Sequence, residues 1–90
     1  MKNKILKQLY IPKVEVELFR SKMEHLIVAL SGSNKVEYST YLDNYKEEEV
    51  IVFNTIIYGD SEEEVNKEYE KFKELIQENF GEETKEKEGN

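Results

Sequence analysis

The chain has 90 residues, with one proline, four glycines, no cysteine and a net charge of −7. This length indicates a single domain, and the lack of cysteine excludes disulfides and thiolate metal sites. No segment matches a signal peptide or approaches the roughly 20 apolar residues that cross a bilayer, so we expect a cytoplasmic protein that does not contact membranes.

The charge is unevenly distributed along the chain. Residues 1–35 hold seven Lys or Arg and three Glu, a balance of +4, whereas residues 36–90 hold six Lys and seventeen Asp or Glu, a balance of −11. Such an anionic majority repels phosphates and attracts cationic surfaces. We therefore predict no direct binding to nucleic acid and favour a protein partner with a basic surface.

The N-terminal segment, residues 2–10, fits either a short helix or an added strand. Its apolar residues share one helical face: Ile5, Leu6, Leu9 and Tyr10. A helix of nine residues is marginal unless it docks, and Pro12 ends it in any case.

Two strands are predicted next, over residues 13–19 and 23–31. The first alternates strictly, with Val14, Val16 and Leu18 on one side, and this period of two is typical of a half-buried strand. The alternative is one helix over residues 13–30, supported by the spacing of Val14, Leu18, Leu26 and Leu30.

A hairpin loop at Gly32-Ser33-Asn34 would then lead into a third strand at residues 35–42, followed by a loop at 43–46. The fourth strand, residues 49–58, is apolar on both sides. Its two faces are Val50, Val52, Ile56 and Tyr58 on one side, and Ile51, Phe53 and Ile57 on the other. A strand of this kind is covered on both faces or is central in its sheet.

Residues 61–80 carry the clearest helical pattern. Five apolar side chains recur at helical spacing: Val65, Tyr69, Phe72, Ile76 and Phe80. Ser61 and Glu64 have the spacing of a capping box, and Gly81 stands where a left-handed residue would end the helix. Residues 81–90 hold no apolar side chain and are predicted to be disordered.

The predicted fold is a single α+β domain over residues 1–80. It has a small, four-stranded, mostly antiparallel sheet with one C-terminal helix packed on one face. One helix covers only one face, so the second face needs the N-terminal segment, a second copy or a partner.

No catalytic or ligand-binding signature stands out. His25 is the only histidine, and no serine lies in a nucleophile motif. The glycines are scattered, which excludes a phosphate loop, and neither glutamate triplet resembles a calcium loop. We expect a protein that is not an enzyme and that binds no cofactor and no metal.

Two glutamate triplets flank the most apolar segment. Glu62–Glu64 fill a first helical turn, where the helix dipole favours anions, whereas Glu47–Glu49 have no such role. The latter either protect a sticky strand from aggregation or form a binding surface together with nearby tyrosines. The predicted partner-binding residues are Tyr41, Asp43, Tyr45, Glu47, Glu48, Glu49, Glu62, Glu63 and Glu64.

The function hypothesis is an acidic binding module that mimics phosphates and occupies a basic site on a nuclease or another nucleic-acid-binding protein. In size, charge and lack of catalytic motifs, the chain resembles small phage-encoded inhibitors such as anti-CRISPR proteins, and immunity proteins against nuclease toxins. This resemblance concerns overall character and rests on no motif. The alternative hypothesis is a self-associating accessory protein, a homodimer formed through the second sheet face.

Overall fold

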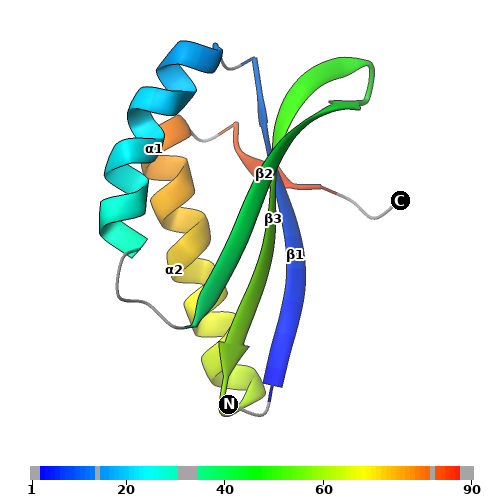
Figure 1. Cartoon of the computed structure of the whole chain (residues 1–90). Helices are drawn as coiled ribbons and strands as arrows, with labels where there is room; N and C mark the ends of the chain where they lie inside the picture. Colours follow the sequence, from blue (N-terminus) through cyan, green and yellow to red (C-terminus); the bar gives the residue numbers. More distant parts are fainter. Residues whose placement is uncertain (1–2, 14, 31–34, 82, 88–90) are drawn as a thin grey trace.

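The computed structural model describes residues 3–13, 15–30, 35–81 and 83–87, and within them the chain forms two helices and four strands (Figure 1). In chain order these are β1 (Asn3–Pro12), α1 (Val16–Leu30), β2 (Val36–Tyr45), β3 (Glu48–Gly59), α2 (Glu62–Phe80) and β4 (Lys85–Glu86).

All four strands belong to one antiparallel sheet with the order β2-β3-β1-β4. Both helices lie on the same face of this sheet (Figure 1). This is the ferredoxin-like βαββαβ arrangement. The predicted α+β class and four-stranded antiparallel sheet are confirmed, but the prediction of a single helix is wrong.

The missed helix is α1, which replaces the two strands predicted over residues 13–31. The alternation that suggested a strand covers only three apolar residues, whereas the whole segment is rich in strong helix formers such as Leu, Glu, Lys, Arg and Met. The alternative prediction, one helix over residues 13–30 in place of two strands, is confirmed, but the apolar side chains that face the core differ in part from those predicted. The side chains that pack on the core are Phe19, Met23, Leu26 and Leu30, while Leu18 is exposed and Val14 lies outside the described residues.

The N-terminal segment is a central strand. Ten consecutive residues of β1 pair with β3, with Leu9 opposite Phe53 and Ile11 opposite Ile51. Leu9 and Ile11 are buried in the core, whereas Leu6, which shares its helical face with Leu9 in the sequence pattern, is largely exposed. Pairing with β3 gives hydrogen-bond partners to backbone groups along the whole segment, whereas a helix of nine residues is only marginally stable. The extended form is therefore favoured.

The β2–β3 hairpin is longer and tighter than predicted. Residues 43–45 continue β2 instead of forming a loop, and only Lys46 and Glu47 turn the chain. Both turn residues have positive φ, 51° and 65°, as a two-residue type I′ turn requires. The loop predicted at residues 32–34 lies outside the described residues, and the strand expected before it is helical.

Helix α2 confirms the prediction for residues 61–80. The Ser61 hydroxyl accepts a hydrogen bond from the Glu64 N–H at 3.1 Å, and the Glu64 carboxylate accepts one from the Asp60 N–H at 3.0 Å. The helix buries Val65, Tyr69, Phe72 and Ile76. Gly81 has a φ of 100°, but its ψ of 163° is not that of a left-handed helical residue.

The core lies between the helices and the sheet, with Phe53 at its centre. Phe53 is fully buried, and four rings surround it at centroid distances of 6.0 to 6.2 Å: Phe19, Tyr38, Phe72 and Phe80. The core therefore unites both helices with the middle of the sheet.

Strand β4 lies inside the segment 81–90 for which the sequence predicts disorder. Lys85 and Glu86 pair with Tyr10 and Leu9 of β1, and the preceding Thr84 is buried. The Tyr69 hydroxyl donates to Glu86 Oε1 at 2.8 Å, which ties this strand to α2. Lys85 and Glu86 thereby form the fourth strand of the sheet.

Candidate functional site

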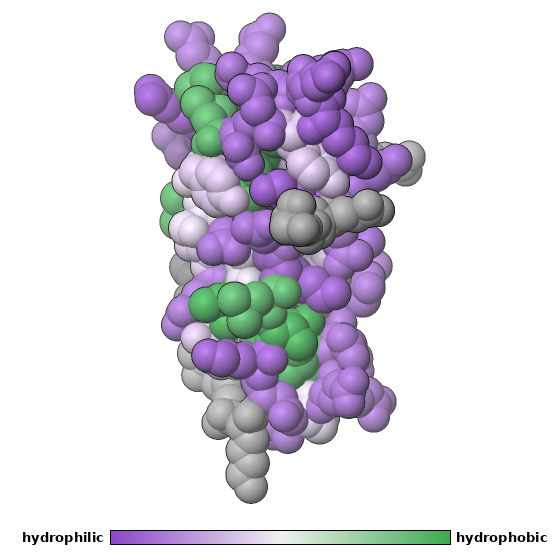
Figure 2. All heavy atoms as spheres, turned by 90° about the vertical axis from the view of Figure 1, so that its right-hand side faces the viewer, coloured by the Kyte–Doolittle hydropathy of each residue, from purple (hydrophilic) through white to green (hydrophobic). Residues whose placement is uncertain are grey.

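The sheet face without helices, called the open face below, is where the sequence predicts a need for additional cover. Figure 2 shows this face as mostly hydrophilic, with a compact apolar area in its lower half and a second apolar area at its upper left edge. The alternation along β3 places Val50, Val52, Ile56 and Tyr58 on this face. The prediction of an exposed apolar ribbon concerns these four residues.

Half of this ribbon is sealed by the chain itself. Val50 is 2% exposed and Val52 is 0% exposed. The rings of Tyr10 on β1 and Tyr45 on β2 meet at a centroid distance of 4.8 Å, although β3 lies between their strands. The contact therefore closes over β3.

Lys87 makes a second bridge over the same place. Its backbone N–H donates to the Gln8 carbonyl at 2.7 Å, and its ammonium group lies 3.2 Å from the Asp43 carboxylate on β2. Figure 1 shows the end of the β2–β3 hairpin curving toward this segment. Of the three covers that the sequence left open for this face, the N-terminal segment contributes one through Tyr10. Together with Tyr45 and Lys87 it covers this part of β3, which therefore requires no partner or second copy.

The remaining part of the open face is a small apolar area. Leu6 pairs with Ile56, and Leu6 is 64% exposed whereas Ile56 is half-buried. The side chains next to them on this face are polar, and the Gln8 amide donates a hydrogen bond to the Tyr41 hydroxyl at 3.1 Å. This area is too small to require a partner, because monomeric proteins commonly expose single apolar residues.

The structure brings the predicted residues Tyr41, Asp43 and Tyr45 together on the open face, but each makes a contact within the chain. Tyr41 accepts from Gln8, Asp43 pairs with Lys87, and Tyr45 packs on Tyr10. Glu47, Glu48 and Glu49 extend from the tip of the same hairpin and are exposed. Within the described part of the chain these three glutamates form no ion pair.

The predicted residues Glu62, Glu63 and Glu64 lie at the other end of the molecule. They begin α2 two residues after the end of β3, whereas the first triplet lies at the start of β3, with Glu47 in the turn and Glu48 and Glu49 in the strand. A strand rises about 3.3 Å per residue, so β3 separates the two triplets by more than roughly 30 Å. The nine predicted residues therefore form two separate clusters.

Glu64 is committed to the fold. Its carboxylate lies 2.7 Å from the Lys35 ammonium and accepts from the Asp60 N–H. The hydrogen bond from Lys35, followed by that from the backbone of Asp60, lowers the pKa of the Glu64 carboxyl. This glutamate connects the start of α2 to the start of β2.

Further along α2, a row of exposed glutamates continues the second cluster, and the sequence prediction included only its first member, Glu63. Glu63, Glu70, Glu74 and Glu78, called the α2 ridge below, recur on the outer side of the helix, with Lys67 between the first two. Among the described ion pairs none involves a ridge glutamate. The same helical period that identified the apolar stripe would have revealed this row.

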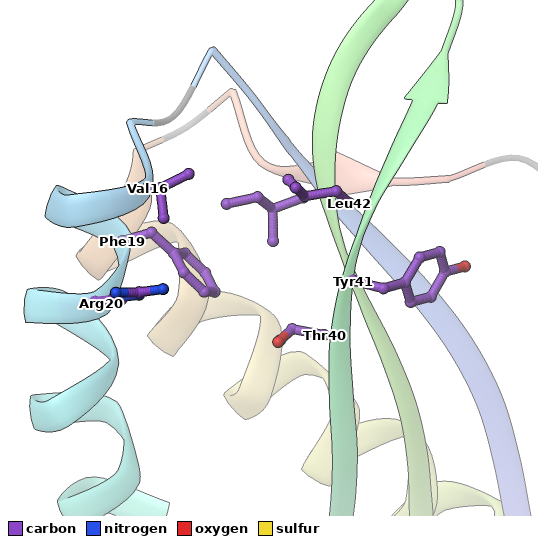
Figure 3. A pocket seen from close by; sticks show the side chains of 7 residues that line it. Val16, Phe19, Arg20, Thr40, Tyr41 and Leu42 are labelled. Atoms are coloured by element: carbon purple, nitrogen blue, oxygen red, sulfur yellow. The ribbon is translucent and has the colours of Figure 1, made fainter.

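An apolar hollow lies between α1 and β2. It has a volume of about 230 Å³, and its lining is Val16, Phe19, Arg20, Thr40, Tyr41, Leu42 and Ile51. In Figure 3, Val16 and Phe19 point from the helix toward Leu42, while Tyr41 points to the opposite side of the sheet. Leu42 is 59% exposed here, because α1 packs mainly against α2 and leaves β2 uncovered.

No arrangement for catalysis emerges among the described residues. His25 is exposed on α1, not on a strand as predicted. No group of three or more His, Asp or Glu side chains in the described ranges is placed to hold a metal ion. Within the same ranges, neither helix is long and apolar enough to cross a membrane.

Comparisons with protein-family models, with curated proteins and with solved structures give no significant match. The proposal below therefore rests on the geometry and charge of the chain.

Proposed function

We propose that this chain is a non-enzymatic binding module that occupies a basic, nucleic-acid-binding surface of another protein through the α2 ridge. The observation that carries this proposal is the row of exposed carboxylates on α2, which form no ion pair among the described residues. The partner it would fit is a nuclease or another protein that binds phosphates. Such a module would act as an inhibitor, as anti-defence and immunity proteins do.

The ridge is held on a rigid support. The opposite side of α2 is buried against β1 and β3 through Val65, Tyr69, Phe72 and Ile76, and Ser61 caps its first turn. A binding surface that is already ordered loses little conformational entropy on association. The ridge glutamates are thus presented at fixed positions along one line.

The chemistry of the ridge suits a phosphate-binding partner. Glu70, Glu74 and Glu78 follow each other at intervals of four residues, or about 6 Å along the helix axis. A row of closely spaced anionic oxygens is what Arg and Lys clusters recognise in nucleic acid, through charge-assisted hydrogen bonds. The hairpin-tip cluster of Glu47–Glu49 would add a second contact at a distance.

The alternative function, self-association through the second sheet face, loses its main support. It assumes an uncovered apolar ribbon on β3, yet Val50 and Val52 are buried by the chain itself. Among the described residues of that face, Leu6 and Tyr41 are the large apolar side chains that remain exposed.

The test is affinity capture from a lysate of the native host with the tagged full chain. We expect a basic protein that binds at about 50 mM salt, elutes by about 500 mM, and is displaced by double-stranded DNA. A variant with Glu70→Gln, Glu74→Gln and Glu78→Gln should lose this protein.

The matched control removes three exposed glutamates elsewhere, Glu15, Glu17 and Glu24, so that net charge changes equally. This control should still capture the partner. Equal loss in both variants would mean that only overall charge matters, and capture that resists high salt would refute the proposal.

A further inference from the structure

We infer that the free edge of β2, together with the hollow beside α1, is an interface between two copies of this chain. In this dimer the two β2 strands pair antiparallel about a twofold axis and join the two sheets into one. The inference goes beyond the proposed function, since it uses no residue of the α2 ridge.

The backbone of β2 offers a row of unused hydrogen-bonding groups. Tyr45 and Glu48 flank a two-residue turn, and the Lys35 carbonyl accepts from the Tyr58 N–H at 2.8 Å. The members of these two hydrogen-bonded pairs on the β2 side, Lys35 and Tyr45, both have odd numbers. Hydrogen-bonded and non-hydrogen-bonded pairs alternate along an antiparallel ladder. The even-numbered residues from Val36 to Asn44 therefore point their N–H and C=O groups away from the sheet.

Strand β2 contains no lysine, proline or bulge, and its two charged residues are Glu37 and Asp43, of which Asp43 is paired with Lys87. Edge strands are commonly protected by lysine, proline, bulges or a covering element. The even-numbered side chains of β2 are all uncharged: Val36, Tyr38, Thr40, Leu42 and Asn44. α1 leaves Thr40 and Leu42 exposed, and the hollow lies directly beside them (Figure 3).

The sequence of β2 is complementary to itself in one register. When Tyr41 lies on the twofold axis opposite its own copy, the outward-pointing residues pair as Thr40 with Leu42 and Tyr38 with Asn44. Ser39 then faces Asp43 and Glu37 faces Tyr45, so no like charges are directly opposed. A shift that centres the pair on Thr40 would oppose Glu37 and Asp43, and is disfavoured.

The surroundings of the edge favour a second copy in spite of the net charge of −7. α1 has Glu17 and Glu24 against Arg20 and Lys22, so it contributes no net charge. The α2 ridge lies on the helix that packs over β3 and β1, away from β2. Dimerisation would cover the exposed side chains of Leu42 and of Val16, which lines the hollow from α1.

The first test is sedimentation equilibrium of the full chain over a micromolar concentration series. We expect a reversible dimer whose dissociation constant rises by about tenfold or more in Leu42→Lys and in Thr40→Pro. Thr40→Pro removes an N–H that points outward and spares the ladder with β3, and circular dichroism verifies that each variant is folded. Leu6→Lys, on the open face, is the matched control and should leave dimerisation unchanged.

The second test fixes the register by cross-linking, because the chain has no cysteine of its own. Opposed residues of a non-hydrogen-bonded pair have Cα atoms about 4.5 Å apart, within the range of a disulfide. Tyr41→Cys should form a disulfide-linked dimer under mild oxidation, whereas Ser39→Cys and Leu6→Cys should not. A monomer at every concentration, or a dimer broken by Leu6→Lys and not by Leu42→Lys, would overturn the inference.

Discussion

Truncation of Val52 to alanine should destabilise this protein strongly, although Val52 lies on the sheet face that no helix covers. Val52 is fully buried on the open face, where the contact of Tyr10 with Tyr45 and the bridge from Lys87 to Asp43 close over β3. The substitution therefore tests whether the chain seals this face by itself.

The expected magnitude follows from burial. Replacing valine by alanine removes two methyl groups, each worth about 0.8 kcal/mol of transfer free energy when fully buried. The cavity that remains adds to this, so we expect a loss of about 2–3 kcal/mol in the free energy of unfolding. That loss is a large part of the roughly 5–13 kcal/mol that a chain of this length commonly has.

Leu6→Ala is the comparison on the same face. Leu6 is 64% exposed, so only about a third of its side-chain surface can contribute, or at most roughly 1 kcal/mol. If the free energy of unfolding falls with urea at the same slope in both variants, urea denaturation gives the two losses of unfolding free energy directly. If Val52→Ala costs no more than Leu6→Ala, the open face is not sealed by its own chain.

Three further predictions concern local features of the fold. Ser61→Ala should lower the free energy of unfolding by about 1 kcal/mol in urea denaturation, because the hydroxyl caps α2. Replacement of Lys46-Glu47 by Asn-Gly should raise the free energy of unfolding by about 1 kcal/mol or more, and with it the urea midpoint, since both residues have positive φ; a lower midpoint would contradict the type I′ turn. The Tyr69 hydroxyl, and then Lys7, lower the pKa of the Glu86 carboxyl, so its contribution to stability is present above the unfolded-state pKa and is lost as pH falls through the folded-state pKa. Glu86→Gln should therefore reduce the loss of stability on acidification, and an unchanged pH profile would show that β4 is not held by this contact.

One part of the candidate site could be predicted from sequence patterns, and the other part was decided only by folding. The length of the strand before Glu62 already implied that the two glutamate triplets lie apart, and the α2 ridge was present in the helical period of the sequence. The sequence gives no sign that Asp43 and Tyr45 bind Lys87 and Tyr10, because these contacts join residues more than thirty positions apart.

Local patterns were sufficient where one repeat of apolar residues continued over many positions and fitted only one kind of structure. The stripe and cap of α2, and the two apolar faces of β3, could be predicted because many residues repeat one spacing and few alternatives fit it.

The tertiary structure decided the segments whose patterns were short or shared by two structures. Residues 13–31 fitted both strands and a helix, and residues 2–10 became β1 only by pairing with β3. The cover of Val50 and Val52 also comes from three other segments, through Tyr10 of β1, Tyr45 of β2 and Lys87 after β4. The free energy that settles such choices lies in contacts between distant residues, so no pattern within the segment itself can contain it.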